Sequence, residues 1–560
     1  MKKTGAQIIV ECLLEQGVDT VFGYPGGAVL NIYDALYEYS DKIRHVLTAH
    51  EQGASHAADG YARTTGKTGV VIATSGPGAT NLVTGIATAY MDSVPMVAIT
   101  GNVAVDLLGR DSFQEVDITG ITMPITKHNF VVKRVEDLAN TIREAFRIAV
   151  SKRPGPVLID VPKDITAAVT EYTPAEPLPP ASLPAMKEEA VQKAVQMLKE
   201  AKRPLIYAGG GVISSGSTEE LIQLAEKLQA PVCCSVMGLG GFPADHRLFA
   251  GMIGMHGTYA ANKATQEADL LLVAGARFSD RVAGDRKQFA SQAKILHLDI
   301  DPAEIDKNVH TAYSLVGDLK QLLGGLSRGI PEERHDAWLK EVENWKAGHP
   351  VPPQDNGEYP DPMAIIDAVR ARTCDDDIMV TDVGQHQMWV AQRYRFNRPR
   401  TFATSGGLGT MGCGLGAAIG AKVANPGRKV VLFTGDGSFH MNLNELTTLA
   451  SYELPVVVMV MNNSVLGMVR QWQKLFYGYR FSQTDPHRKT DLVKLAEAFG
   501  VTGLRITKPE EVETVVEKAL ALGKPVVVDC RISPDCNALP MIPPGASADA
   551  IMMTMPDPTA

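Results

Sequence analysis

The chain has 560 residues, of which 45% are apolar and 21% are charged, and its formal net charge is −9. A chain of this length can form three domains of ordinary size, each with its own core. The acidic balance, without a run of basic residues, argues against nucleic acid as the main partner.

Cysteine usage and hydropathy indicate a soluble protein of a reducing compartment. The seven cysteines form no CxxC pair, so neither a zinc site nor a disulfide framework is predicted. The first residues lead directly into an amphipathic pattern instead of an apolar signal core. The longest apolar runs, such as residues 454–461, are too short to cross a bilayer. We therefore expect a cytoplasmic protein without a membrane segment.

Two proline-rich stretches divide the chain. Residues 168–187 and 347–362 contain five prolines each. Proline at this density blocks helices and central strands alike, so both stretches are predicted to be linkers. The predicted domains are residues 1–167, 188–346 and 360–560.

An internal repeat relates the outer two domains. Residues 70–102 align with residues 430–462 at an offset of 360 without a gap, which places Val70 on Val430 and Asn102 on Asn462. A repeat of this length indicates two copies of one fold. Strand-like apolar runs alternate with helical patterns, which is typical of βα units. We predict an α/β protein of three doubly wound parallel-sheet domains, the first and third being related.

In the first domain, two motifs follow predicted strands. The motif YPGGA at residues 24–28 contains Gly27, and its glycine pair either relieves strain in a turn or allows a cofactor ring to approach. The motif HEQGA at residues 50–54 contains Glu51, which taken alone is typical of a solvated glutamate capping a helix. The repeat places Glu51 opposite Met411, and both positions are predicted to begin a helix of small residues at a strand end.

Three further residues of the first domain are ambiguous from spacing alone. Phe113 and Gln114 lie in DSFQEVD (111–117), and Lys163 lies in RPGPVLIDVPKD (153–164). Each is compatible with an ordinary surface or packing role.

The middle domain has features of a dinucleotide-binding fold. Gly209, Gly210 and Gly211 follow the predicted strand at residues 204–207, and Asp299 ends a later strand. A glycine-rich first turn and an acidic residue after a later strand suit a dinucleotide. The triple glycine is not GxGxxG, so a purely structural domain is nearly as compatible. A lone histidine such as His256 is more often a core residue than a cofactor contact.

The third domain carries the most specific pattern, at residues 429–473. Asp436, within Gly-Asp-Gly, follows one predicted strand, and Asn463 follows the next. The carboxyl ends of neighbouring parallel strands face one crevice, so we expect the two side chains to converge. A carboxylate with an amide oxygen forms an incomplete oxygen coordination sphere, which suits Mg²⁺ and a phosphate. The nearby glycines allow a diphosphate to approach the backbone.

These motifs together resemble a known family. Gly-Asp-Gly followed some two dozen residues later by Asn-Asn resembles the thiamin diphosphate motif. Over nearly the whole chain, YPGGA, HEQGA, SGPGATN (75–81), DSFQEVD, MHG (255–257), ARFSDR (276–281), GTMG (409–412) and NNSVLGMVRQWQ (462–473) resemble the catalytic subunit of acetolactate synthase. The resemblance implies a thiamin diphosphate enzyme with Mg²⁺ and with an FAD that takes no part in net redox.

The resemblance also implies roles for residues at the reaction centre. Glu51 would hydrogen-bond the aminopyrimidine ring and start ylid formation, a task for which burial would raise the pKa of an acid. Met411 would hold the cofactor bent. The metal would be bound by Asp436, Asn463 and the carbonyl of Val465. Gly27, Phe113, Gln114 and Lys163 would line the reacting face. The other implied thiamin diphosphate contacts are Gly384, Gln385, His386, Gly409, Gly437, Ser438, Leu466, Gly467 and Met468.

FAD and the second substrate are assigned by the same resemblance. Arg281 and Trp472 would recognise the second 2-oxoacid, because a guanidinium pairs with a carboxylate and an indole packs the extra methyl group. Plain core packing is an alternative role for Trp472. The implied FAD contacts are Arg153, Gly210, Gly211, His256, Gly257, Arg277, Asp299 and Asp318.

The implied activity is condensation of pyruvate with a second pyruvate or with 2-oxobutyrate, after loss of CO₂. The family resemblance implies a homodimer or homotetramer, whose cofactor rings are held by different subunits, and a regulatory small subunit. Two other readings remain open: another thiamin enzyme, such as a pyruvate oxidase or decarboxylase, and a flavoprotein that retains the fold without catalysis.

Overall fold

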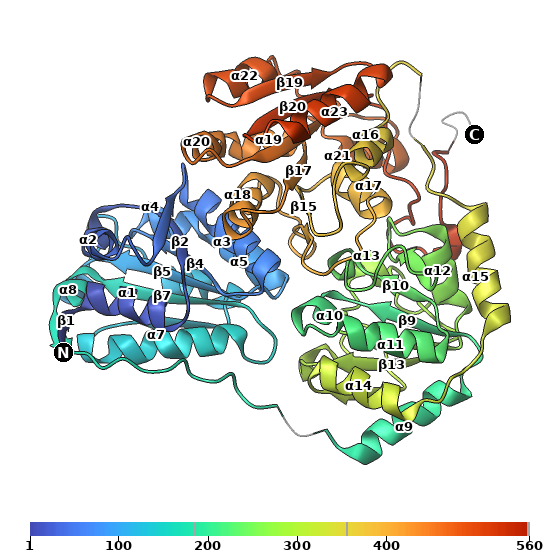
Figure 1. Ribbon diagram of the computed structural model, residues 1–560, viewed down its shortest axis with the longest axis horizontal. Helices are drawn as coiled ribbons and strands as arrows, with labels where there is room; N and C mark the ends of the chain where they lie inside the picture. Colours follow the sequence, from blue (N-terminus) through green and yellow to red (C-terminus); the bar gives the residue numbers. More distant parts are fainter. Residues whose placement is uncertain (184–185, 354–356, 557–560) are drawn as a thin grey trace.

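The computed structural model describes residues 1–183, 186–353 and 357–556. Three lobes follow the order of the chain, and the third lies against the first two (Figure 1). Each lobe is built on one six-stranded sheet of parallel strands. The predicted α/β class, with three doubly wound parallel sheets, is confirmed. In the described residues, no helix is both long and apolar enough to span a membrane.

The first sheet has the strand order β3-β2-β4-β5-β7-β6. Its strands are β2 (Thr20–Tyr24), β3 (Arg44–Leu47), β4 (Gly69–Ala73), β5 (Met96–Asn102), β6 (His128–Val131) and β7 (Pro156–Pro162). The central strands are buried on both faces, which explains their continuous apolar runs. Helices α1 (Gly5–Glu15), α2 (Leu30–Glu38) and α7 (Val135–Val150) pack on one face, and α3 (Glu51–Thr65) and α5 (Val83–Met91) pack on the other.

The third sheet repeats this topology. Its order is β16-β15-β17-β18-β20-β19, the same as in the first sheet when each strand is replaced by its later counterpart. The strands are β15 (Ile378–Thr381), β16 (Phe402–Ala403), β17 (Val430–Gly435), β18 (Val456–Asn462), β19 (Thr502–Ile506) and β20 (Val526–Arg531). Helices α18 (Gly414–Ala424), α20 (Leu446–Ser451) and α22 (Leu492–Ala498) cover one face, and α16 (Pro362–Arg370), α17 (Gln385–Arg393) and α23 (Val512–Ala521) cover the other.

The middle sheet has the order β11-β10-β9-β12-β13-β14. All its strands are parallel, and the chain adds strands toward one edge from β9 and toward the other edge from β12. Its strands are β9 (Pro204–Ala208), β10 (Val232–Cys234), β11 (Phe249–Met252), β12 (Leu270–Ala274), β13 (Lys294–Asp299) and β14 (Tyr313–Val316). Helices α9 (Glu188–Glu200), α11 (Thr218–Leu228) and α14 (Leu319–Gly329) lie on one face, and α12 (Tyr259–Glu267) and α15 (Asp336–Gly348) lie on the other.

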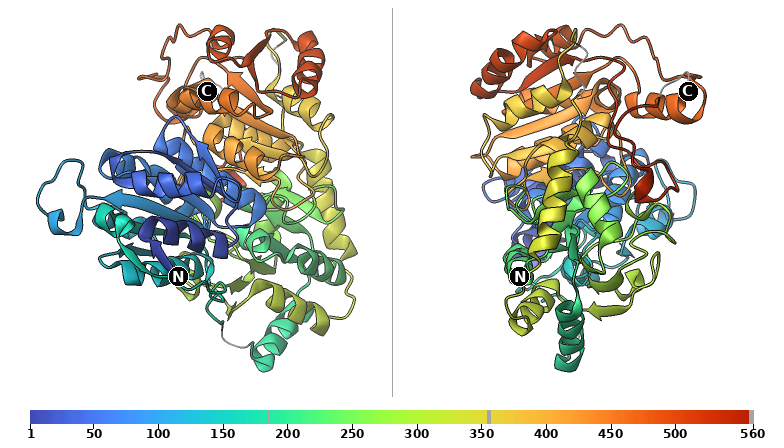
Figure 2. Two further views of the ribbon diagram at one scale, coloured as in Figure 1. Left: turned by 60° about the vertical axis from the view of Figure 1, so that its left-hand side comes forward. Right: turned by 90° about the vertical axis from the view of Figure 1, so that its right-hand side faces the viewer.

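The first and third domains are joined by close packing of α3 against α18. A Cβ atom on Gly60 would lie 2.1 Å from the carbonyl oxygen of Ala417, and one on Gly420 would lie 1.8 Å from that of Ala57. Neither position has room for a side chain, so the two helix backbones approach closely. One apolar core cluster accordingly contains residues of both domains. Figure 2 shows the two domains in contact from a second direction.

Two local features differ from the predictions. Strand β8 (Val169–Glu171) lies inside the predicted linker 168–187 and pairs antiparallel with β1 (Lys2–Thr4), so the first fold continues to the buried Tyr172. Met411 does not begin a helix, and that prediction was wrong. Met411 lies in a turn and α18 begins at Gly414, because Gly412 has a φ of 90°, which no helix accommodates.

Candidate active site

The predicted metal residues lie at adjacent strand ends. Strands β17 and β18 are parallel neighbours, with Gly435 paired to Met461. Asp436 follows β17 directly and begins α19 (Asp436–Asn442), and Asn463 follows β18 directly. Both side chains are buried, with 4% and 7% of their surface exposed. The two oxygen-bearing side chains therefore line one buried edge of the third sheet.

The Asp436 carboxylate lacks the partners that a buried charge needs. Its Oδ1 atom is buried without a hydrogen-bond partner. The other oxygen lies 3.7 Å from the guanidinium of Arg488. Burial raises the pKa of Asp436 to about 6, and the charge of Arg488 opposes this rise. An unpartnered buried carboxylate oxygen beside the Asn463 amide fits a hard cation such as Mg²⁺.

Two glycines near this carboxylate leave the backbone in close contact with neighbouring side chains. A Cβ atom on Gly437 would lie 2.8 Å from the Leu466 side chain and 3.7 Å from Cε of Met411. A Cβ atom on Gly467 would lie 2.0 Å from Oε1 of Gln385. Leu466 and Met411 thus converge over the turn that carries Asp436, and bare backbone faces them.

The turn after β15 completes this part of the site. The Gln385 side chain accepts a hydrogen bond from Asn463 Nδ2 at 3.3 Å and donates one to Gln471 at 3.0 Å. Ser438 Oγ donates to the carbonyl oxygen of Val383 at 2.9 Å, beside Gly384. Burial lowers the pKa of His386 to about 3, so the ring is neutral, and its Nε2 is buried without a partner. Gly409 is exposed and Met468 is half-buried in α21 (Gly467–Phe476).

A second group of predicted residues lies in the first domain. Glu51 is the first residue of α3, where its Oε2 accepts a hydrogen bond from Asn81 Nδ2 at 3.0 Å. A Cβ atom on Gly78 would lie 3.2 Å from Oε1 of Glu51. Glu51 is half-buried and Gly27 is exposed, with nothing within 4 Å of its Cβ position. This group therefore faces open space within the single chain.

The remaining first-domain candidates are also exposed. Phe113 is 87% exposed and lies, with Gln114, in the segment between β5 and α6 (Ile118–Thr122), which projects from the domain (Figure 2). Lys163 is exposed at the start of α8 (Lys163–Ala167). Among the described residues, no hydrogen bond or ion pair connects Glu51, Gln114 or Lys163 with Asp436 or Asn463. The two groups of predicted residues therefore make no direct polar contact within the described part of the chain.

Arg281 and Trp472 meet although they belong to different domains. The guanidinium of Arg281 lies 5.7 Å from the centre of the Trp472 ring. The Arg281 side chain is 61% exposed, and Nε1 of Trp472 is buried without a hydrogen-bond partner. An exposed guanidinium beside an unsatisfied indole N–H can bind a small carboxylate.

Three of the predicted FAD residues, Gly210, Gly211 and Arg277, lie in the turns at the switch point of the middle sheet. A Cβ atom on Gly209 would lie 2.3 Å from the carbonyl oxygen of Gly275, and one on Gly211 2.6 Å from its Cα. The turns after β9 and β12 thus pack on each other, and this packing alone requires both glycines. Gly210 and Gly211 begin α10 (Gly210–Ser214). A crevice at such a switch point is where dinucleotides bind.

The other predicted FAD residues are partly engaged. Arg153 pairs with Glu304 at 2.7 Å, Asp299 accepts from the Asp301 backbone at 2.9 Å, and Asp318 caps α14. His256, beside Gly257, is buried, which lowers its pKa to about 4, and its Nδ1 has no partner. The orphaned His256 nitrogen and the switch point fit a polar cofactor. Arg277 lies in the turn after β12.

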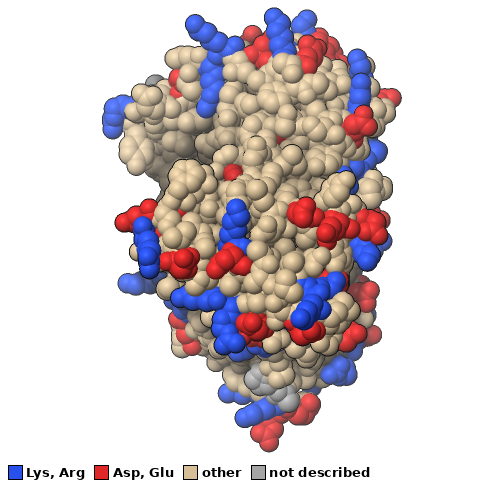
Figure 3. Space-filling view, turned by 90° about the vertical axis from the view of Figure 1, so that its left-hand side faces the viewer, with Lys and Arg blue, Asp and Glu red and all other residues tan. Residues whose placement is uncertain are grey.

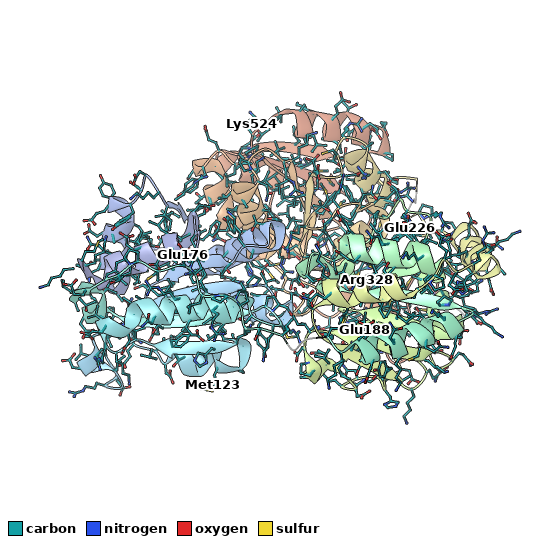
Figure 4. All side chains as sticks on the ribbon, turned by 60° about the horizontal axis from the view of Figure 1, so that its bottom comes forward. Met123, Glu176, Glu188, Glu226, Arg328 and Lys524 are labelled. Atoms are coloured by element: carbon teal, nitrogen blue, oxygen red, sulfur yellow. The ribbon has the colours of Figure 1, made fainter. Side chains whose placement is uncertain are left out.

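A cavity of about 1440 Å³ lies elsewhere, across α11 and α14. Charged residues of both signs line it, including Glu226 and Arg328, which Figure 4 shows on these two helices. Of the predicted site residues only Asp318 lines it. We therefore do not place the reaction centre there. Among the described residues, no cluster of three His, Cys, Asp or Glu side chains could hold a metal, so a metal at Asp436 needs amide and backbone oxygens.

Three residues near the site have no role in the sequence predictions. Arg488 contacts Asp436, Gln471 holds Gln385, and Glu445 contacts the backbone before Glu51. Arg488 lies in a polar stretch beside Lys489, and Glu445 lies between Asn444 and Leu446; neither neighbourhood indicates that the charged residue is in a buried contact. Only Gln471, within NNSVLGMVRQWQ, lies in a motif that the sequence singled out.

Comparisons with known proteins agree with this architecture. Residues 3–121 match the thiamine pyrophosphate enzyme N-terminal TPP binding domain, residues 191–326 the central domain, and residues 382–530 the C-terminal TPP binding domain. The fold and site therefore define a thiamine pyrophosphate enzyme.

Full-length relatives narrow this class. An acetolactate synthase of Mycobacterium bovis is 48% identical over 98% of this chain and 91% of its own length. The acetolactate synthase large subunit of Parasynechococcus marenigrum is 48% identical over 99% and 91%, and the isozyme 3 large subunit of Escherichia coli 44% over 98% of both chains. The chain belongs to the family of acetolactate synthase large subunits.

Proposed function

We propose that this chain is the catalytic subunit of an acetolactate synthase. The enzyme decarboxylates pyruvate and joins the remaining two-carbon unit to a second pyruvate, giving 2-acetolactate, or to 2-oxobutyrate, giving 2-aceto-2-hydroxybutyrate. This is the first common step of valine, leucine and isoleucine synthesis. The observation that carries the proposal is full-length similarity to acetolactate synthases together with Asp436 and Asn463 at adjacent strand ends.

The third domain holds the diphosphate end of the cofactor in this proposal. Asp436, Asn463 and the carbonyl of Val465 would bind Mg²⁺, and the bare backbone at Gly437 and Gly467 would face the phosphates. Bound thiamin diphosphate supplies the electron sink that pyruvate needs in order to lose CO₂. Met411 and Leu466, which converge over Gly437, would hold the cofactor in its bent form.

The first domain supplies the acid. Glu51 would exchange a proton with the aminopyrimidine ring, and the hydrogen bond from Asn81 orients its carboxylate. Gly27, Phe113, Gln114 and Lys163 would border the reacting atoms and exclude water. In the single chain these residues are exposed, which is a reason to expect that another subunit covers them.

Arg281 and Trp472 would select the second substrate. The Arg281 guanidinium would pair with the carboxylate of the incoming 2-oxoacid, and the Trp472 ring would pack against its alkyl group. Their 5.7 Å contact places charge and apolar surface side by side, as a small 2-oxoacid requires.

The middle domain would bind FAD at its switch point, close to Gly210, Gly211, His256 and Arg277. The orphaned Nδ1 atom of His256 supports a polar ligand there. This flavin would have a structural role, because the condensation consumes and releases no electrons.

The active assembly would be a homodimer or a homotetramer with a regulatory small subunit, in the cytoplasm. Figure 3 shows the face on the first-domain side, whose upper half carries few charged side chains. Exposed apolar side chains of the first and third domains include Leu30, Leu47, Phe113 and Met441. Such surface suits burial against another subunit. All seven cysteines are free, which suits a reducing compartment.

Product analysis tests the proposed function. The purified protein is incubated with pyruvate, thiamin diphosphate and Mg²⁺, and the products and oxygen uptake are measured. We expect 2-acetolactate and CO₂ without oxygen consumption, and none from Asp436→Asn. Acetate with oxygen uptake would indicate a pyruvate oxidase, acetaldehyde a decarboxylase, and no turnover a non-catalytic protein.

A further inference from the structure

Glu445 is a charged residue in a fully buried position between two domains. It ends the short 3₁₀ turn Leu443–Glu445, nine residues after Asp436 in the third domain, and none of its surface is exposed. Its side chain crosses into the first domain. There it accepts hydrogen bonds from the backbone N–H of Ala49 at 3.1 Å and of His50 at 3.0 Å. Thr448 Oγ1 donates a third, at 2.6 Å.

The residues that Glu445 binds immediately precede Glu51, the first residue of α3. The first N–H groups of a helix have no partner within the helix, and the helix dipole favours a negative charge there. Glu445 provides both an acceptor and a charge at that end. The chain also leaves room for it, since a Cβ atom on Gly53 would lie 2.0 Å from Oε1 of Glu445.

A buried carboxylate is costly, so its retention requires a compensating role. Burial raises the pKa of Glu445, and its three donors oppose this rise. A simple domain contact does not need a charge, as a second bond across the same pair of domains shows. There the backbone N–H of Leu47, the last residue of β3, donates to the neutral hydroxyl of Tyr452 at 2.8 Å, four residues before α3 begins.

We infer that Glu445 is a positioning residue, which fixes the start of α3 and thereby the direction of the Glu51 carboxylate. This inference rests on the proposed role of Glu51 in proton exchange. Through Glu445, the third-domain segment that begins at Asp436 determines the placement of the acid of the first domain. Displacing an acid by about 1 Å can reduce a rate by about 100-fold, so such a contact can govern turnover.

Glu445→Gln is the sharpest variant, since it keeps the size of the side chain and turns one acceptor into a donor that faces backbone N–H groups. In the holoenzyme we expect kcat to fall by about 10–100-fold. We expect KM for pyruvate to change by less than about twofold, because Glu445 makes no contact with the substrate in the proposed site. An unchanged kcat in a folded variant would overturn the inference.

A double-mutant cycle separates positioning from a merely structural role. If Glu445 acts through Glu51, Glu51→Gln with Glu445→Gln is no slower than Glu51→Gln alone. Independent, additive losses would overturn the inference. The matched control is Tyr452→Phe, which removes another hydrogen bond between the same two domains and leaves kcat within about twofold of the parent. An equal loss in Tyr452→Phe would show that any weakened domain contact has the same effect.

Hydrogen exchange of the cofactor-free protein provides a readout without activity. Because both amides donate to Glu445, we expect the amides of Ala49 and His50 to be protected in the parent and to exchange faster in Glu445→Gln. Unchanged protection would overturn the inference. Should Glu445→Gln fail to fold, Thr448→Val removes one donor to the carboxylate and is expected to lower kcat several-fold, with an unchanged kcat counting against the inference. If the parent makes no 2-acetolactate, the proposed function fails. Amide exchange still tests whether Glu445 holds the backbone of Ala49 and His50.

Discussion

The first and third domains share one topology, and a comparison between them shows which parts of the fold are structural. In both, an asparagine at the end of the central strand donates to a buried aspartate on the neighbouring strand. Asn102 donates to Asp160 at 2.6 Å, and Asn462 donates to Asp529 at 2.7 Å. This pair survives in a domain with no metal residues, so it belongs to the fold.

The two domains differ at the turn after the preceding strand. The repeat places Gly76 opposite Asp436. Gly76 has a φ of 57°, and a Cβ atom there would lie 2.8 Å from the carbonyl oxygen of Gln114. In the third domain this turn carries the carboxylate of Asp436. In the first domain the backbone of Gln114 packs closely against Gly76 in the same turn. The same strand end therefore carries the proposed metal ligand in one domain and a close backbone contact in the other.

The largest expected effects come from substituting these two positions, Asp436 and Gly76. Asp436→Asn should reduce Mg²⁺ affinity and turnover by more than about 100-fold, beyond the loss typical of an outer-shell partner. Its unfolding free energy should not fall, because the substitution removes a buried carboxylate with one unpartnered oxygen and only a long ion pair to Arg488. Gly76→Ala should lower the unfolding free energy by about 1–3 kcal/mol through backbone strain and leave Mg²⁺ affinity intact. Calorimetric titration with Mg²⁺ and urea unfolding measure both, and the reverse pattern would contradict the comparison.

The shared Asn–Asp pairs differ in charge, which gives a second test. Asp529 pairs with Arg505 at 3.0 Å and Arg531 at 2.9 Å, whereas Asp160 has only neutral donors. Asp529→Asn removes this carboxylate from both guanidinium groups, and among the described residues only Arg505 keeps another ion-pair partner, Asp491. Because these groups are partly exposed, we expect a loss of about 2 kcal/mol in unfolding free energy. Asp160→Asn should cost less than about 1 kcal/mol at pH 7.

The raised pKa of Asp160 predicts that the free energy of unfolding depends on pH. Burial raises its pKa from 3.8 to about 6, and hydrogen bonds from Asn102 and Thr100 oppose the rise. A raised carboxyl pKa means that protonation favours the folded state. Its contribution to stability is thus complete below pH 3.8 and is lost as the pH rises through about 6. Urea unfolding between pH 4 and 7 should show a shallower decline in Asp160→Asn than in the parent, and an identical slope would refute this role of Asp160.

The last prediction concerns the choice of the second 2-oxoacid. Trp472 lies in α21, which follows the loop after Asn463 in the third domain. The first domain has no residue with a predicted role in substrate choice at the corresponding place. Trp472→Leu should lower the preference for 2-oxobutyrate over pyruvate by about 10-fold, the worth of one methyl contact. Phe476→Leu, which alters the ring packed edge-on at 5.7 Å from that of Trp472, should change the product ratio less than about twofold. Competition between the two 2-oxoacids measures it, and an unaltered ratio in Trp472→Leu would remove its role.

Periodicity and the repeat predict most of this fold. Buried parallel strands are continuous apolar runs, and consecutive strands place Asp436 and Asn463 at one edge, so these features follow from the sequence. The contact of Arg488 with Asp436 joins residues 52 positions apart, with strand β18 and several helices between them, and has no sequence signal. Glutamate is typical of surface positions, and Glu445 is buried only because the first and third domains pack against each other. Close packing of α3 on α18 likewise depends on tertiary contacts that periodicity does not encode.

The central claim is that the active site is built from a half of each related domain, contributed by different chains. Glu51→Gln and Asp436→Asn each inactivate one half, so the two variants are mixed, subunit exchange is verified with differently tagged chains, and 2-acetolactate formation is measured. If the halves come from different chains, hybrid dimers contain one intact site, and about a quarter of the parent activity returns on random exchange. No recovery after verified exchange would place both halves in one chain and contradict the account.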